Sequence, residues 1–263
     1  MRSAPVQQGF RLPPSQLVHE YWKSLPSSPR GAVSDAPMQG GGLEEFSEAC
    51  VLPLTDDGAP ISMTLFDPSE ELIWSVSGSG MIYSHMLPTA EPYSAFRADA
   101  AGGAPVLGLF PNPYGVIALM PDSVRFFAKG GMQQADVRLP ELQVNTCGCL
   151  TPSSSSAKLA IVSAFNPVQP TLSLLDLTTA TITARLQLSL DAPPSLARYD
   201  EQMRVLLLSG ADGNVSAYDL RAGGAKPAGS CPLFRGKQSV VCDFDVAGSA
   251  VVASGAPMSA DEC

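Results

Sequence analysis

Residues 61–134 of the chain read ISMTLFDPSEELIWSVSGSGMIYSHMLPTAEPYSAFRADAAGGAPVLGLFPNPYGVIALMPDSVRFFAKGGMQQ. Short apolar runs in this stretch are separated by turn signals, among them Asp67-Pro68 and the Pro-Asn-Pro segment at residues 111–113. Apolar runs of this length between such turns are typical of β-strands. The stretch therefore predicts an all-β protein with many short strands.

The same pattern recurs over the rest of the chain as four units and part of a fifth. The Asp-Leu pairs that begin at Asp176 and Asp219 lie 43 residues apart. A period of roughly 40–45 residues is that of a four-stranded WD-repeat propeller blade. The predicted strands are 61–67, 72–77 and 81–86; 106–110, 115–120, 123–128 and 133–139; 147–150, 158–164, 171–177 and 181–188; 195–200, 204–210, 215–220 and 228–234; 240–245 and 250–255.

Strands such as VLLLS (205–209) are apolar on both faces, as stacked blades require. We therefore predict an all-β, WD-repeat-like β-propeller over residues 46–263, with about four complete blades and part of a fifth in an incomplete ring. A β-sandwich is the alternative, which the repeat disfavours. The ending MSADEC follows closely on an apolar strand, so we expect either a longer protein or an open edge that must pair or aggregate.

Residues 1–45 are rich in Pro, Ser, Gly and Gln, which predicts a disordered N-terminal arm. Within it, QLVHEYWK (16–23) can form a short helix or a docking peptide, and its Tyr21-Trp22 pair fits a packed edge contact equally well. The arm has no continuous apolar region of the signal-peptide kind, and no apolar run in the chain approaches 18 residues.

The net charge is −9, whereas a protein that grips a phosphate backbone is normally basic. This balance disfavours strong binding to bare RNA or to an anionic membrane. Six cysteines without a CxxC pair are too few for a disulfide scaffold. They are typical of reduced, mostly buried thiols in a cytosolic or nuclear protein.

Several segments carry a family resemblance: EACVLPL (48–54), FDPSEELIW (66–74) with SGSG (77–80), YSAFR (93–97), PVLG (105–108), GVIAL (115–119) and CDFDVAG (242–248). They resemble the N-terminal propeller of the catalytic subunit of the PAN complex, the poly(A)-specific ribonuclease that depends on poly(A)-binding protein. The resemblance covers about residues 46–255 and is specific over 48–130. Met120-Pro121 and the serine tract at 153–156 depart from it.

The resemblance implies a pseudokinase partner subunit and a part in shortening mRNA poly(A) tails. In the family, a partner-binding linker, an inactive ubiquitin-hydrolase-like domain and an exonuclease accompany the propeller. This sequence contains none of those three parts.

Asp243 and Asp245 alternate on one predicted strand, so both carboxylates face the same side. Such a pair can hold Mg²⁺ for phosphodiester hydrolysis, and the resemblance implies an exonuclease that uses acidic residues of this kind. Because the rest of a nuclease fold is absent, we interpret the pair as part of a blade strand whose carboxylates bond turn amides.

Other polar and aromatic groups also have structural interpretations. DPSEE (67–71) predicts a turn with solvated glutamates. Trp74 is predicted to lie in the core. Tyr93 and Phe96, close to Arg97, fit core packing better than a surface groove.

Cys147 and Cys149 share a strand face, but no further Cys or His stands at zinc spacing. The two histidines, His19 and His85, offer almost no candidates for acid–base catalysis. NVS (214–216) fits a glycosylation sequon, but we interpret it as a tight turn. No phosphate-binding glycine loop is present.

We therefore expect no catalytic, cofactor-binding or metal-binding residue, and no cofactor; the partner-binding residues stay unidentified. The first hypothesis is a non-catalytic propeller scaffold of a PAN deadenylase. It docks the pseudokinase regulatory subunit and, through protein contacts, poly(A) ribonucleoprotein, with weak or no direct RNA binding and no membrane. We expect a cytoplasmic location that extends to P-bodies and the nucleus. The alternatives are an enzyme with its site at the propeller centre and an unrelated WD-repeat adaptor, such as one of a vesicle coat or ubiquitin ligase.

Overall fold

β-Strands are the only regular secondary structure among the described residues. The computed structural model describes residues 58–138, 144–151, 157–165, 168–190, 193–210, 213–221, 226–232, 239–247 and 250–257. Within them, 18 strands form five antiparallel sheets, and no helix is long and apolar enough to cross a membrane. The predicted all-β class is confirmed. The predicted arm (residues 1–45) and the first residues of the predicted propeller lie outside the described residues.

The first two sheets are four-stranded, and each strand pairs with the next along the chain; such a sheet is called a blade below. Blade 1 consists of β1 (Ile61–Phe66), β2 (Leu72–Ser77), β3 (Met81–Met86) and β4 (Glu91–Arg97). Blade 2 consists of β5 (Gly108–Asn112), β6 (Gly115–Leu119), β7 (Ser123–Phe127) and β8 (Gln133–Arg138).

Two more blades and a two-stranded sheet follow in the same strand order. Blade 3 consists of β9 (Val144–Thr151), β10 (Lys158–Phe165), β11 (Val168–Asp176) and β12 (Thr181–Gln187). Blade 4 consists of β13 (Pro194–Asp200), β14 (Val205–Gly210), β15 (Asn214–Asp219) and β16 (Gly229–Pro232). The fifth sheet pairs β17 (Ser239–Ala247) with β18 (Ala250–Pro257).

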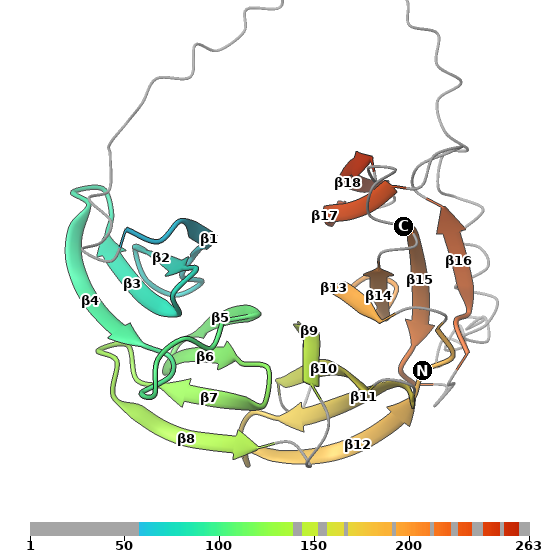
Figure 1. Cartoon of the computed structure of the whole chain (residues 1–263), viewed down its shortest axis with the longest axis horizontal. Helices are drawn as coiled ribbons and strands as arrows, with labels where there is room; N and C mark the ends of the chain where they lie inside the picture. The colour runs from blue at the N-terminus through green and yellow to red at the C-terminus, as the bar shows by residue number, and fades with distance from the viewer. Residues whose placement is uncertain are drawn as a thin grey trace, which may run out of the picture.

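The sheets follow one another around an arc in chain order, with the first strand of each blade innermost and the fourth outermost (Figure 1). Blade 1 and the fifth sheet form the two ends of the arc. This radial order of small sheets is that of a propeller and excludes the two-layer sandwich. The prediction of four complete blades with part of a fifth is confirmed.

Apolar cores fill the space between successive blades, because alternate side chains of a strand point to opposite faces of its sheet. In β6, Val116 and Ala118 pack towards blade 1, whereas Ile117 and Leu119 pack towards blade 3. The central strands β10 and β14 divide their side chains in the same way between their two neighbours. Each of blades 2, 3 and 4 therefore depends on both adjacent sheets for burial, which explains the doubly apolar runs.

Blade 1, at the end of the arc, differs on its outward face. Leu72, Trp74 and Val76 of β2 pack against blade 2, but Ser75 and Ser77 alternate with them on the opposite face. On this outward face, no other sheet of the described residues packs against blade 1. The face is correspondingly more polar than the one that contacts blade 2.

The predicted strands agree with the structure except at a few positions. β4 was not predicted as a strand, because it is an outer strand with mostly exposed side chains and contains Pro92, which edge strands tolerate. β5 includes Pro111 and Asn112, which were predicted to lie in a turn. Asn214 begins β15 instead of forming part of a tight turn. The serine tract at residues 153–156 lies outside the described residues.

Candidate functional site

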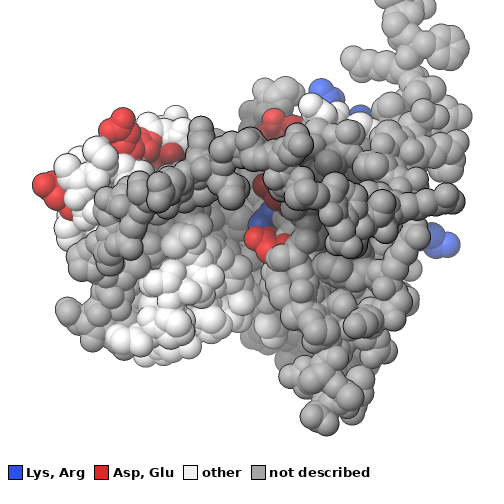
Figure 2. Space-filling model, turned by 90° about the horizontal axis from the view of Figure 1, so that it is seen from above, with Lys and Arg blue, Asp and Glu red and all other residues white. Residues whose placement is uncertain are grey.

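A cavity of about 600 Å³ lies where the innermost strands β1, β5, β9, β13 and β17 converge. Its described lining contains two charged residues, Arg198 and Asp243, whose Nη2 and Oδ1 atoms lie 2.8 Å apart. Acidic and basic side chains are visible in the hollow between the two ends of the arc (Figure 2). Because the two charges neutralise each other and no nucleophile–base pair lines the cavity, this lining offers no constellation for catalysis.

Asp243 and Asp245 lie on β17, so the interpretation as a blade strand is confirmed. Asp243 pairs with Arg198 and accepts the neighbouring Phe244 amide at 2.9 Å, in place of the expected turn amides. Phe244 between them is buried against blade 4. Among the described residues, no group of three or more His, Cys, Asp or Glu side chains is placed to hold a metal ion.

Asp67 organises the turn between β1 and β2. Its Oδ1 accepts the Ser69 amide at 2.9 Å, the Ser69 hydroxyl at 2.8 Å and the Glu70 amide at 3.0 Å. Its Oδ2 accepts the indole N–H of Trp74 at 3.1 Å. Burial alone raises the pKa of Asp67, but these hydrogen bonds and the charge of Lys129 outweigh it, so this pKa lies below its ordinary value. The carboxylate is therefore held ionised in the turn.

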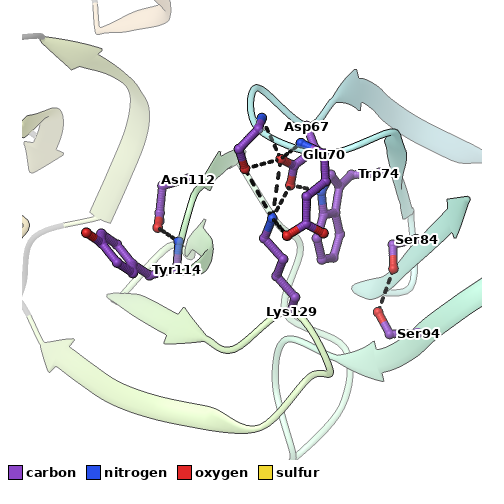
Figure 3. Close-up of polar contacts among 9 residues, drawn as sticks. Asp67, Glu70, Trp74, Ser84, Ser94, Asn112, Tyr114 and Lys129 are labelled. Carbon is purple, nitrogen blue, oxygen red and sulfur yellow. Dashed lines mark hydrogen bonds and ion pairs between the residues drawn. The ribbon is translucent and has the colours of Figure 1, made fainter.

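Lys129 joins this turn to blade 2 (Figure 3). From the turn between β7 and β8, its Nζ lies 2.7 Å from Glu70 Oε1 and 3.4 Å from Asp67 Oδ2. Burial lowers the pKa of Lys129, but its hydrogen bond to Glu70 and the two carboxylate charges raise it above its ordinary value. We call Asp67, Glu70, Trp74 and Lys129 the interblade clamp. The predicted turn is confirmed, but Glu70 is paired across the blades and not simply solvated.

Aspartates elsewhere hold turns in the same way. Asp200 Oδ1 accepts the amides of Gln202 and Met203 at 2.9 and 3.1 Å. Asp176 and Asp219, whose spacing revealed the repeat, also accept amides two residues ahead at 2.9 Å. These carboxylates close turns, which leaves them poorly suited to proton transfer or metal binding.

Cys147 and Cys149 lie on one face of β9 and are buried in the core between blades 3 and 4. Burial raises the pKa of both thiols to about 12. They are protonated core residues at neutral pH, as the expectation of reduced, buried thiols requires. Cys231 is partly exposed, and Cys50 and Cys263 lie outside the described residues.

The aromatic predictions were partly correct. Trp74 is fully buried, and Phe96 packs on Phe127 with ring centroids 5.0 Å apart. Tyr93 is half exposed on the outer strand β4, so its prediction as a core residue was wrong. His85 is buried in β3, and burial lowers its pKa. His19 lies outside the described residues.

A second cavity, of about 580 Å³, opens between blades 2 and 3 beside the β5–β6 turn. Tyr114, Val116 and Ile117 line it from blade 2, and Leu177 with Thr178 lines it from blade 3. No charged residue occurs among its described lining residues. We call this cavity the Tyr114 groove.

The sequence reasoning missed Tyr114, whose side chain is 87% exposed, although a signal was available. An aromatic residue directly after Pro111, Asn112 and Pro113 stands in a turn, where it has no blade partner. The Tyr114 amide donates to Asn112 Oδ1 at 2.9 Å, which holds that turn. The groove itself could not be predicted, because blade 3 supplies its other wall.

Comparisons with known proteins agree with the propeller fold. The family model described as "PAN2 N-terminal" matches residues 45–260. The catalytic subunit PAN2 of the PAN2-PAN3 deadenylation complex from Yarrowia lipolytica is 34% identical over 86 residues, which are 33% of this chain and 8% of that protein. The subunit from Mus musculus is 28% identical over 198 residues, which are 75% of this chain and 15% of that protein.

A solved structure, the Neurospora crassa Pan2 WD40 domain, matches with a TM-score of 0.59 and 19% identity, and the match covers 72% of this chain and 53% of that one. At that identity the likeness supports the fold, a WD40 propeller. The chain spans only 8% and 15% of the length of the two curated relatives.

Proposed function

The chain belongs to the PAN2 N-terminal family, and on that premise we propose that it is the non-catalytic propeller scaffold of a poly(A)-shortening catalytic subunit. The observation that carries the proposal is the family match, which extends over residues 45–260. In this role the chain docks the partner subunit, a pseudokinase of the PAN3 type, and poly(A) ribonucleoprotein. It thereby supports the shortening of mRNA tails.

The disposition of the acidic side chains supports a non-catalytic role. Buried carboxylates such as Asp67 and Asp200 are engaged by turn amides. In the described lining of the central cavity, Arg198 and Asp243 form an ion pair and neutralise each other. Hydrolysis of a phosphodiester by two metal ions needs several carboxylates that converge on open space.

The charge of the chain supports contacts with protein more than with bare RNA. A net charge of −9 opposes the release of counterions from phosphate that drives binding to nucleic acid. Propeller turns from successive blades form a broad surface on a rigid support, which suits docking to other proteins. A protein with these partners acts in the cytoplasm, including P-bodies, and in the nucleus.

A pull-down tests the docking role. The purified chain is immobilised, and the pseudokinase subunit and poly(A)-binding protein of the same organism are applied separately as recombinant proteins. Retention of the pseudokinase subunit or of poly(A)-binding protein is the expected result. A chain that retains neither, while circular dichroism shows it folded, overturns the proposal.

A nuclease assay tests the absence of activity. The chain is incubated with labelled poly(A) and Mg²⁺, and no shortening is expected. Shortening that disappears in the Asp243→Ala variant would instead place a nuclease site on β17.

A further inference from the structure

Four turns of blades 1 and 2 form one surface, which we call the turn face. Because the strands are antiparallel, the β1–β2 and β3–β4 turns lie at the same end of blade 1, and the β5–β6 and β7–β8 turns at the same end of blade 2. Lys129 in the β7–β8 turn reaches Asp67 and Glu70 in the β1–β2 turn. The four turns therefore face the same side of the arc, and Figure 3 shows Tyr114 on the other side of Lys129 from this pair.

The turn face exposes large apolar side chains. Phe66 is 71% exposed, Met86 46%, Tyr114 87% and Met132 69%, and each lies at or beside one of these turns. Apolar side chains gathered on one face, unlike single scattered ones, mark an interaction surface. The Tyr114 groove, about 580 Å³ and without a charged lining residue, opens on the same face and can receive an aromatic or aliphatic side chain.

The turn face is also acidic. Its four turns and the first residue of β4 contain the carboxylates Asp67, Glu70, Glu71 and Glu91 and the single ammonium of Lys129, a net charge of −3. Figure 2 shows acidic side chains gathered at the end of the molecule that blade 1 forms. Apolar anchors beside an acidic cluster fit a ligand that is basic and carries aromatic or aliphatic side chains.

This charge decides between the kinds of occupant. Nucleic acid is repelled, because its phosphates meet the same sign of charge. A second copy of the face is disfavoured as well, since a two-fold interface sets the patch against itself and brings like charges together. A basic polypeptide segment is the ligand that complements both properties.

One segment outside the described residues has this chemistry. Residues 10–30 read FRLPPSQLVHEYWKSLPSSPR, with three basic residues and one acidic residue in a chain whose net charge is −9. Their aromatic and aliphatic residues include the adjacent pair Tyr21-Trp22, which Lys23 follows directly. We propose that residues 10–30 dock in cis on the turn face, with Tyr21 or Trp22 in the Tyr114 groove and the basic residues beside Glu71 and Glu91.

The length of the connection permits this contact. Thirty-four residues lie between Lys23 and Gly58, where the described chain begins. Fully extended, they span on the order of 100 Å. The six-residue strand β1 runs between the two turn-bearing ends of blade 1, which therefore lie only about 20 Å apart. A tether of this kind holds a ligand at an effective concentration on the order of 1 mM, so an intrinsic Kd of about 100 μM gives about 90% docking.

The inference goes beyond the proposed scaffold role and does not depend on it. It concerns a contact within one chain, between residues 10–30 and the turn face.

Tryptophan quenching in the full chain tests the proposal. The chain has two tryptophans, and Trp74 is fully buried, so quenching by acrylamide reports chiefly on Trp22. A Trp22→Phe variant supplies the Trp74 baseline, and a synthetic peptide of residues 10–30 supplies the undocked reference. With about 90% docking, the Trp22 quenching constant is expected to be about tenfold below that of the peptide.

Two variants and one control locate the contact. Tyr114→Ser removes the aromatic wall of the groove, and Glu71→Lys reverses a charge that makes no ion pair with Lys129. A tenfold weaker contact lowers docking to about 50%, so the quenching constant rises about fivefold in each variant. The control is Val144→Ser. Val144 is exposed and begins β9, at the end of blade 3 away from the turn face, so this substitution leaves the Trp22 quenching constant unchanged.

Three outcomes overturn the proposal. The first is a quenching constant for Trp22 equal to that of the peptide. The second is protection that survives both turn-face variants, which would place the contact elsewhere. The third is protection that depends on chain concentration, which would make the occupant another copy's segment. The pull-downs with partner proteins are a separate measurement, so a negative result in the quenching experiment leaves the proposed function unaffected.

Discussion

The clearest quantitative prediction concerns Asp67→Asn. The substitution keeps the size of the side chain but leaves one acceptor oxygen where the carboxylate has two. Oδ1 of Asp67 accepts three hydrogen bonds from Ser69 and Glu70, and Oδ2 accepts the Trp74 indole. In either orientation the amide of asparagine turns an N–H towards one of these donor groups, so at least one buried hydrogen bond is lost.

The magnitude follows from burial. The Asp67 side chain is fully buried and the Trp74 indole is inaccessible, so water cannot replace the lost acceptor. A buried donor without a partner costs about 1–3 kcal/mol. The loss of charge also weakens the contact with Lys129, whose side chain is 10% exposed. We expect the free energy of unfolding to fall by about 3 kcal/mol at pH 7.

The effect depends on pH with a definite sign. The fold lowers the pKa of Asp67, so its stabilising contribution is complete above the unfolded-state pKa of about 3.9 and is lost as pH falls through the folded-state pKa. Urea unfolding, followed by circular dichroism and Trp74 fluorescence at pH 7 and below pH 3, measures the difference. The gap between the wild type and Asp67→Asn is expected to narrow at the lower pH.

A matched control separates this effect from a general loss of negative charge. Asp136 pairs at 3.6 Å with Arg138, whose side chain is 77% exposed, so Asp136→Asn is expected to change stability by less than about 0.5 kcal/mol. The reasoning is refuted if Asp67→Asn and Asp136→Asn unfold at the same urea concentration. It is also refuted if the Asp67→Asn deficit is equal at both pH values.

Three further predictions follow from burial and packing. Cys147 and Cys149 should resist iodoacetamide in the native chain at pH 8 while Cys231 reacts, as mass spectrometry of peptides will show; native labelling of the pair contradicts their burial. Leu207→Ala should lower the free energy of unfolding by about 2–5 kcal/mol in urea, because it opens a cavity between blade 4 and β17. Gly115→Val should lower the free energy of unfolding by about 1–3 kcal/mol in the same assay, because the added Cβ meets a backbone carbonyl of β7. An unchanged urea midpoint would argue against that close approach.

Local patterns were sufficient to predict the strands other than the outer strand β4. The runs 115–119 and 205–209 are continuously apolar, so they place apolar side chains on both faces of their strands. This feature indicated stacked blades. The turn at Asp67 was equally visible, because Asp and Pro act on the backbone within a few residues. These features were predictable since their causes lie within one hairpin.

Features that depend on neighbouring blades were not predictable. Glu70 was expected to be solvated, but a lysine 59 residues further along the chain binds it. Tyr93 was expected in the core, but its strand is the outermost of blade 1, and no sheet among the described residues covers it there. The family resemblance supplied the context of the chain and no information on which side chains lie exposed.

The sequence by itself determined the class, the period and the strand positions of this protein, because hydrophobic alternation and turn chemistry act between residues close in the chain. The tertiary structure alone decided that Lys129 meets Asp67, that Arg198 meets Asp243, and that Phe66 and Tyr114 share an acidic face. The physical reason is that the radial order of the blades brings together turns that are distant in sequence, and no local pattern encodes which turns become neighbours.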